Sequence, residues 1–410
     1  GRIDIPGGGQ VVVDGKYAYV GHMKPPHGTT ILDISDPADP RVVSNIDLPD
    51  PYSHTHKVRV VGDLMFTNVE PYDRHFLRKS SDLAALRGQL TETLGRAPGD
   101  GEIAQDLGVD AARIGELDAM VERGYDAGGF RIYDIADRSA PKLLSHTLTH
   151  GFGVHRFDVD ENYAYVSTEM EGYIGNILVI YDIADASAPR EAGRWWMPGQ
   201  HLAGGEKPSW QGYKTRLHHA LRVGDEMWAA CWHGGFRVLD VSDISNPRTI
   251  AAHDYHPPFP EPTHTILPLP ELIDGRRIAV AVDEEHQHSR GRLHGFLWVL
   301  DVTDFSNITA CSAFDVSEME SPWARSAGRF GAHQFREKMD GTLVYATWFA
   351  GGLRVVDVAD PYHPKEVAHY IPEPLGGEAA PQSNDVDVDD RGLIYLLDRN
   401  RGLDILEMTL

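Results

Sequence analysis

Over most of its length the chain alternates between short apolar stretches and polar turns. Within a stretch, β-branched and aromatic residues take every second position, which predicts β-strands with one buried face. One phrase of this kind, a strand followed by an Asp/Ser/Pro turn, occurs six times: "GTTILDISDPADP", "GGFRIYDIADRSAP", "GNILVIYDIADASAP", "GGFRVLDVSDISNP", "HGFLWVLDVTDFSN" and "GGLRVVDVADPYHP". A seventh copy, "RGLDILEMTL", ends the chain without its turn.

Further strands surround each copy of the phrase. Two precede it, as in "HKVRVVGDLMFTNVE" and "HRFDVDENYAYVSTE", and the short Gly/Asp/Asn turn between them is typical of a hairpin. Another short strand follows. The repeating unit therefore has four antiparallel strands, here called a to d in chain order. Seven such units predict an all-β fold, a seven-bladed β-propeller.

The two ends of the chain are expected to close the propeller together. The last copy lacks a strand d, and the first residues, "GRIDIP", are similar to the strand d segment "SNIDLP". We therefore expect the N-terminal strand to complete the last blade, so that residues 1–410 form a single propeller.

One long interruption is predicted in the second blade, between strands b and c. Residues 73–127 follow the helical period of 3.6 residues, which predicts a small helical insertion. We expect it to form a lid over the channel or a contact between copies in a homo-oligomer. Its "LGRAPGDGEIAQDLGVDAARI" resembles the helix-turn-helix of bacterial sigma factors. DNA binding is nevertheless not expected, because residues 82–123 carry nine acidic and four basic side chains.

The repeat phrase itself carries a family resemblance. "FRVLDVSD" and "LRVVDVAD" resemble the repeats of the LVIVD-repeat propeller proteins. The resemblance covers nearly the whole chain and implies the propeller fold. It implies no particular activity, because propellers host many unrelated chemistries.

Histidines recur at one position of the repeat, the start of strand a. Five blades have one there, and the other two have Gly9 or Gln10, and Asn384. For the fourth blade we select His219 over His218, because His219 continues the apolar alternation of its strand. Strand a lines the channel of a propeller, so these side chains should converge and bind a transition metal. The predicted metal ligands are His56, His155, His219, His264 and His333.

Acidic residues end several of the b strands, on the same face as the histidines. They are Glu70, Glu169, Asp283, Glu284 and Asp398. They could orient the imidazoles, bind the metal themselves or act as bases. The predicted catalytic residues are Glu70, Glu169, Glu284, His54 and His233, the two histidines as acid/base groups. The alternative is that the recurring histidines are a structural device, each bonded to a neighbouring backbone.

The loops between the strands are elaborated on this face alone. They are long and rich in aromatic and charged residues, a feature of functional sites, and they predict a small-molecule substrate. One of them, "DEEHQHSRGRLHG", adds His286 and His288 as a second metal site or as solvated residues. Its arginines, Arg290 and Arg292, could bind a substrate carboxylate.

The expected layout of histidines on the axis resembles three groups of propeller enzymes. These are the carotenoid and stilbene cleavage oxygenases, the copper-dependent methanethiol oxidases of the selenium-binding-protein family, and metal-dependent lyases. This resemblance implies a metal-dependent oxidoreductase or lyase. We favour iron or copper and oxidase or oxygenase chemistry on a small organic substrate. One alternative is a zinc- or manganese-dependent lyase or hydrolase, and another is a non-catalytic protein-interaction propeller.

The composition limits which partners and which cellular location can be expected. With 61 acidic and 38 basic residues the net charge is -23, which repels phosphate backbones, so we expect no nucleic-acid partner. No apolar stretch reaches the roughly 18 residues of a membrane span, so we expect no membrane partner. The two cysteines allow at most one disulfide. No signal peptide is visible, so a cytoplasmic location is expected, or a periplasmic or secreted one if a leader has been removed.

Overall fold

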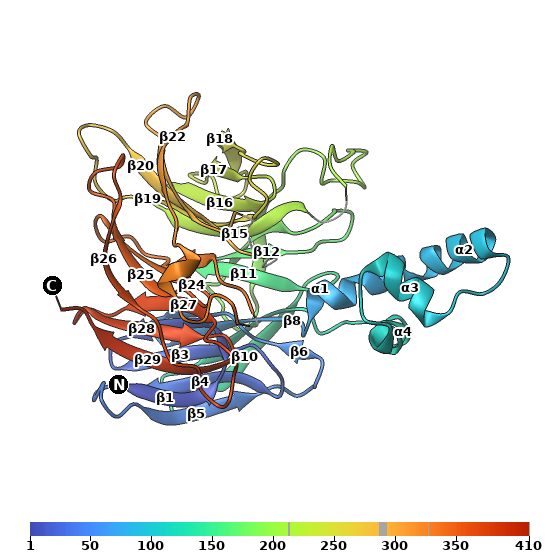
Figure 1. Cartoon of the computed structure of the whole chain (residues 1–410), viewed down its shortest axis with the longest axis horizontal. Helices are drawn as coiled ribbons and strands as arrows, with labels where there is room; N and C mark the ends of the chain where they lie inside the picture. Colours follow the sequence, from blue (N-terminus) through green and yellow to red (C-terminus); the bar gives the residue numbers. More distant parts are fainter. Residues whose placement is uncertain (212–213, 287–292, 327, 410) are drawn as a thin grey trace.

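The strand pairings divide the molecule into repeating four-stranded units. The computed structural model describes residues 1–211, 214–286, 293–326 and 328–409. Within these residues there are seven antiparallel units, two of them joined into one sheet by the pairing of Trp232 with Thr263 (Figure 1). The predicted all-β propeller is confirmed.

The first four units run from the N-terminus in chain order. The first unit contains β2 (Gly8–Asp14), β3 (Tyr17–His22), β4 (His27–Asp33) and β5 (Arg41–Asp47). The second contains β6 (Ser53–His54), β7 (Val58–Val61), β8 (Leu64–Pro71), β9 (Gly129–Asp134) and β10 (Lys142–Leu148). The third contains β11 (Val154–Val159), β12 (Tyr163–Thr168), β13 (Ile177–Asp182) and β14 (Arg190–Trp195). The fourth contains β15 (Thr215–Val223), β16 (Glu226–Trp232), β17 (Phe236–Asp240) and β18 (Arg248–His253).

The remaining three units bring the chain back to its beginning. The fifth contains β19 (Thr263–Pro268), β20 (Ile278–Asp283), β21 (Leu297–Asp301) and β22 (Thr309–Phe314), followed by the 3-10 helix η3 (Glu318–Glu320). The sixth contains β23 (Ala332–Phe335), β24 (Leu343–Trp348), β25 (Gly352–Asp357) and β26 (Lys365–Tyr370). The seventh contains β27 (Ser383–Val388), β28 (Leu393–Asp398), β29 (Arg401–Glu407) and β1 (Arg2–Pro6).

The N-terminal strand closes the seventh unit, as expected from the sequence. β1 pairs antiparallel with β29, with Arg2 opposite Asp404 and Ile3 opposite Leu403. The N-terminal ammonium group donates to the carbonyl of Ile405 at 2.8 Å. The first and last segments of the chain are therefore hydrogen-bonded to each other.

The helical insertion leaves the propeller between β8 and β9. It comprises α1 (Arg74–Leu77), α2 (Leu83–Leu94), α3 (Asp100–Leu107) and α4 (Ile114–Arg123), with 3-10 helices η1 (Arg78–Asp82) and η2 (Ala111–Arg113). The helices pack around a small apolar cluster of their own, which includes Phe76 and Leu117. Figure 1 shows α1 beside the propeller and α2 farthest from it. None of the helices in the described residues is long and apolar enough to span a bilayer.

The innermost strands, strand a of each unit, share an irregularity near their start. In six of them the register with the neighbouring strand shifts there, as between Val154 and Arg156 in β11 or between Thr263 and Thr265 in β19. In the second unit strand a is interrupted at the equivalent position, between β6 and β7. A β-bulge sets two successive residues against one on the partner strand, so both can face the channel.

Candidate metal centre

The bulges build two layers of polar side chains around the channel. The upper layer consists of Gly9, His56, His155, His218, His264, His333 and Asn384. The residue after each of these forms the lower layer, which consists of Gln10, Lys57, Arg156, His219, Thr265, Gln334 and Asp385. The upper layer is here called the histidine ring.

The fourth blade requires a correction. The Nε2 atoms of His218 and His155 lie 3.1 Å apart, and the ring of His218 lies 4.4 Å from that of His264. His219 instead lies in the lower layer, where its Nδ1 is 3.2 Å from the carboxylate of Glu337. His218 therefore takes the ring position that the alternation had assigned to His219, because the bulge in β15 interrupts the alternation on which that assignment depended.

The histidine ring lines a cavity of about 290 Å³. Consecutive rings are close together, with centroid separations of 5.3 Å from His56 to His155 and 4.5 Å from His264 to His333. His54 stacks on His56 at 4.3 Å and also lines the cavity. The predicted convergence of histidines from distant parts of the sequence is thus present in the structure.

Two sets of donor atoms within this cavity can hold a metal ion. The Glu70 group consists of His54, His56 and Glu70, and the Glu284 group consists of His218, His264 and Glu284. In each group the donor atoms lie within 4.8 Å of one another, and all six residues are buried. Imidazole and carboxylate together suit ions such as iron, zinc and manganese.

Hydrogen bonds fix the tautomers of three of the ring histidines, His155, His218 and His333. The Nδ1 of His218 lies 3.0 Å from the carbonyl oxygen of His264, and a carbonyl only accepts, so His218 carries its proton there. His333 donates in the same way to the carbonyl of Asn384, and His155 donates its Nδ1 proton to Glu70 at 2.9 Å. Each neutral ring is thereby left with an Nε2 lone pair, the arrangement found in metal-ligating histidines.

Charge and burial keep these histidines neutral. Burial lowers the pKa of His155 and His218 well below 6.5, and neighbouring cationic side chains lower it further. Burial alone would raise the pKa of Glu70, but Arg74 and the surrounding histidines outweigh it and lower the pKa to about 2. Neutral imidazoles beside an ionised carboxylate are the protonation states that metal binding requires.

Two of the predicted catalytic residues lie outside the cavity lining. His233 lies behind Trp232, with its ring 5.6 Å from that of His256, and burial lowers its pKa to about 4. Glu169 pairs with Arg78 and lies 3.5 Å from Arg74, which lines the cavity. Its carboxylate therefore offsets the positive charge of these two arginines.

Other predicted residues are distributed as follows. His54, Glu70 and Glu284 line the cavity. Asp283 accepts from the indole of Trp298 at 2.8 Å, and Asp398 accepts from the backbone of the turn at residues 400–401. His288, Arg290 and Arg292 lie outside the described residues.

The sequence analysis missed the cationic residues of the site. Arg156 follows His155 and donates to the Nε2 of His264 at 3.0 Å, while Arg74, at the start of α1, contacts Glu70 at 2.7 Å. Lys57 and Arg399 also line the cavity. The available signal was the polar residue that follows each ring position, as in "HK", "HR" and "HH".

Trp232 forms part of the cavity wall in a strained conformation. Its φ is 56°, in the left-handed region that bulky residues rarely adopt. Its ring lies 4.6 Å from that of His218, and the guanidinium of Arg216 lies over it at 4.7 Å. Backbone strain of this kind tends to occur at functional sites, where packing enforces it.

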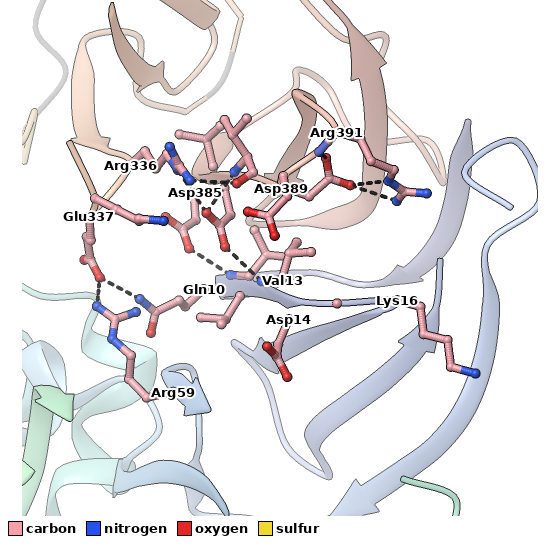
Figure 2. A pocket seen from close by; sticks show the side chains of 18 of the residues that line it. Gln10, Val13, Asp14, Lys16, Arg59, Arg336, Glu337, Asp385, Asp389 and Arg391 are labelled. Atoms are coloured by element: carbon pink, nitrogen blue, oxygen red, sulfur yellow. Dashed lines mark hydrogen bonds and ion pairs between the residues drawn. The ribbon is translucent and has the colours of Figure 1, made fainter. Parts of the chain in front are cut away.

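A second cavity, of about 670 Å³, opens on the opposite side of the lower layer. Figure 2 shows Gln10 and Arg59 directed toward Glu337 beside it. Arg156, which borders the upper cavity, donates to the same carboxylate at 2.5 Å. The lower layer therefore separates the histidine cavity from this second one.

The two cysteines do not form a disulfide. Cys231 is buried, which raises the pKa of its thiol to about 12, and Cys311 is partly exposed. Cys231 is therefore a small apolar side chain in the core of its blade and not a nucleophile.

Comparison with known proteins agrees with this architecture. The family model described as LVIVD repeat matches residues 8–47, 154–196, 224–252 and 339–371, which fall in four of the seven units. The chain therefore carries LVIVD repeats in a β-propeller fold. No curated protein sequence matches this propeller.

Solved structures with the same fold are distant in sequence. They include a chain of the mitotic checkpoint complex, at a TM-score of 0.56 and 8% identity, covering 100% of the LVIVD-repeat propeller and 94% of that chain. The periplasmic gluconolactonase of Pseudomonas aeruginosa has a TM-score of 0.56 and 13% identity, covering 93% and 88%. The WD40 β-propeller domain of Doa1 has a TM-score of 0.54 and 7% identity, covering 99% and 95%. At these identities the likeness concerns the fold alone.

Proposed function

We propose that this protein is a metal-dependent enzyme that binds a transition metal at the histidine ring and acts on a small organic substrate in the cavity above it. The observation that carries the proposal is the fixed tautomers of His155, His218 and His333, whose Nδ1 protons all go to groups that only accept. The three rings line one cavity and each keeps an unprotonated Nε2, which is the arrangement that metal-ligating histidines adopt.

The donor set fits a metal ion and narrows its identity. Two histidines and one glutamate, as in the Glu284 group, are the ligands of non-haem iron oxygenases and also of several zinc hydrolases. Bound there, the ion would polarise a substrate oxygen or activate water or dioxygen. We favour iron, or copper, with oxidation or oxygenation of the substrate.

A second candidate is a zinc- or manganese-dependent hydrolase or lyase. The observation that favours it is the ionised carboxylates within the cavity, because a carboxylate beside the ring can take a proton from a water or a substrate. Burial alone would raise the pKa of Glu284, but His333 and Arg329 outweigh it and hold the pKa well below its usual range, so Glu284 is ionised and can accept a hydrogen bond from a water or a substrate.

The cationic residues of the cavity support the proposal that the substrate is an anion. Arg399 and Lys24 line the cavity, and Arg399 also donates to Asn384 at 3.0 Å. Burial, reinforced by the nearby Arg329, lowers the pKa of Arg399 to about 10, so a negatively charged ligand would relieve this crowding of charge. A carboxylate suits the planar fork of a guanidinium.

Metal analysis tests the proposal directly. The purified protein, as isolated and after reconstitution with iron, copper, zinc or manganese, is expected to hold stoichiometric metal. His218→Ala and His264→Ala should lose it, because each removes a donor of the Glu284 group. His363→Ala is the matched control, since that histidine lies in an exposed turn and should leave the content unchanged.

The outcomes separate the candidate functions. Iron or copper would favour the oxidative enzyme, and zinc or manganese would favour the hydrolase or lyase. A protein that stays metal-free after reconstitution would overturn the metalloenzyme and favour an interaction propeller.

A further inference from the structure

We propose that the Glu70 group and the Glu284 group each hold a metal ion and that the imidazole of His155 bridges the two ions. This inference rests on the proposed function and extends it from one metal ion to two. It is carried by contacts in which two hydrogen-bond acceptors face each other, because such a contact is stable only with a cation between them.

The first contact of this kind lies in the Glu70 group. The Nδ1 of His54 lies 3.0 Å from the carbonyl oxygen of Met23, so in the neutral ring the proton is on Nδ1. Its Nε2 lone pair then faces Oε1 of Glu70, which accepts only, at 3.1 Å. A proton or a metal ion must lie between these two atoms.

His56 adds a further acceptor at the same point. Its Nδ1 accepts from the side-chain amide of Asn68 at 3.2 Å and also lies 3.5 Å from Oε1 of Glu70. The other carboxylate oxygen of Glu70 contacts Arg74 at 2.7 Å, so the carboxylate is held by Oε2 while Oε1 faces the histidines. Three donor atoms therefore converge on one position, and an ion there would neutralise their mutual repulsion and take the place of the Asn68 amide at the Nδ1 of His56.

A separate contact of this kind lies at the Glu284 group. The Nδ1 protons of His155 and His218 are both committed, to Glu70 and to the carbonyl of His264. Their Nε2 lone pairs nevertheless face each other at 3.1 Å. That distance suits two nitrogens bound side by side to one ion at about 2.0–2.1 Å.

His155 connects the two positions. One of its nitrogens lies 2.9 Å from the carboxylate of the Glu70 group, and the other lies 3.1 Å from His218 of the Glu284 group. With His155 included, each ion would have three nitrogen donors and one carboxylate, and the Nε2 of His264 would exchange its hydrogen bond from Arg156 for the bond to the ion. Binding at both nitrogens breaks the Nδ1–H bond of His155, forms a bond from Nδ1 to the ion, and releases the proton to solvent.

Two-metal sites are an established way of activating a substrate from two sides. Here Glu70 and Glu284 come from the ends of β8 and β20, on different blades, so each ion would have its own carboxylate. The ring imidazole between them would hold the ions at a fixed separation, and Arg156 beneath the ring would limit how deep they sit.

Titration with Cu²⁺ tests both the number of ions and the bridge. The chelator-treated full chain is titrated with Cu²⁺ alone, and bound copper and the frozen-solution EPR signal are followed together. We expect two equivalents to bind. The signal should grow with the first and lose intensity with the second, because a bridging imidazolate couples the two unpaired spins. One proton should be released as the bridge forms.

Variants separate the two sites from the bridge. Glu70→Gln and Glu284→Gln should each lose one of the two equivalents, and His155→Ala should keep copper but abolish the loss of EPR intensity. His363→Ala is the matched control and should titrate like the wild type. One equivalent, lost in every ring variant, would overturn the second site and leave the proposed function standing. Two uncoupled equivalents in the wild type would overturn the bridge, and no bound copper would overturn both proposals.

Discussion

Glu337 is the central anion of the channel floor. It receives hydrogen bonds from Gln10 at 2.9 Å, from Arg156 at 2.5 Å and from Arg59, and all of these side chains are largely buried. Two arginines thus share one carboxylate that is largely buried. A buried charge whose partner is removed is costly, so we expect the floor to depend strongly on Glu337.

Replacing Glu337 with Gln should lower the free energy of unfolding by about 3 kcal/mol or more, because the buried Arg156 loses its ion-pair partner and Arg59 keeps only Asp158, at 3.4 Å. Urea unfolding followed by circular dichroism measures the change. The matched control is Glu191→Gln, which breaks a surface ion pair with Arg194 and should cost less than about 1 kcal/mol. Equal losses in the two variants would contradict the role given to Glu337.

The difference in stability between the wild type and Glu337→Gln should depend on pH. Burial raises the pKa of Glu337, but Arg59, His219 and Arg156 outweigh it and hold the pKa far below its usual range. In the unfolded chain the carboxyl takes up a proton near its ordinary pKa of about 4.3. The stability from Glu337 is therefore present above about pH 4.3 and is lost as the pH falls below it. The gap between wild type and Glu337→Gln should narrow in acid, and a constant gap would argue against it.

At the residue scale, the histidines that line the channel could be predicted from the sequence, but the layer in which each side chain lies could not. The histidines were found because one repeat position recurs. His218 and His219 were exchanged because a bulge is invisible in an alternating pattern, and the lower layer went unnoticed for the same reason. The first unit has Gly9 in place of a ring histidine for a steric reason, because a Cβ at this position would lie 2.6 Å from the carbonyl oxygen of His56.

At the scale of elements, β1 is the strand that closes the ring of blades. It contributes Ile5, which is 5% exposed and packs in the cluster shared by the first and last units. Its partner, β29, would otherwise present an open edge. This pairing was predictable, because the last repeat lacks a strand d and the N-terminal segment has the sequence pattern of one. The structure of the loops around the histidine cavity was not predictable, because their sequences do not repeat.

Ile5→Ala should therefore weaken the closure and lower the free energy of unfolding by about 2–4 kcal/mol, since it empties a buried site. Val42→Ala is the matched control. Val42 lies in β5, the corresponding outer strand of the first unit, but is 47% exposed, so its loss should fall within about 0.5 kcal/mol. Urea unfolding of both variants measures the difference. A similar small loss in both would mean that β1 contributes little to closure.

At the scale of the whole molecule, two cavities lie on either side of one polar layer. The histidine cavity and the second cavity have different linings, and the network of Arg156, Glu337 and Arg59 lies between them. The long loops and the root of the helical insertion border the histidine cavity, through residues such as Tyr72 and His75. Metal and substrate should therefore enter and leave from that side alone.

Blocking each side in turn tests this direction of access. In a Cys311→Ser background, Tyr72→Cys and Lys16→Cys place one reactive thiol at the histidine cavity or at the second cavity, because Cys231 is buried. Tyr72 is 37% exposed and Lys16 is exposed, so both positions accept a bulky maleimide. The label at Tyr72→Cys should slow the removal of bound metal by a large chelator several-fold, and the label at Lys16→Cys should leave the rate unchanged. Slower removal with the label at Lys16→Cys would mean that the floor opens and that the channel is continuous.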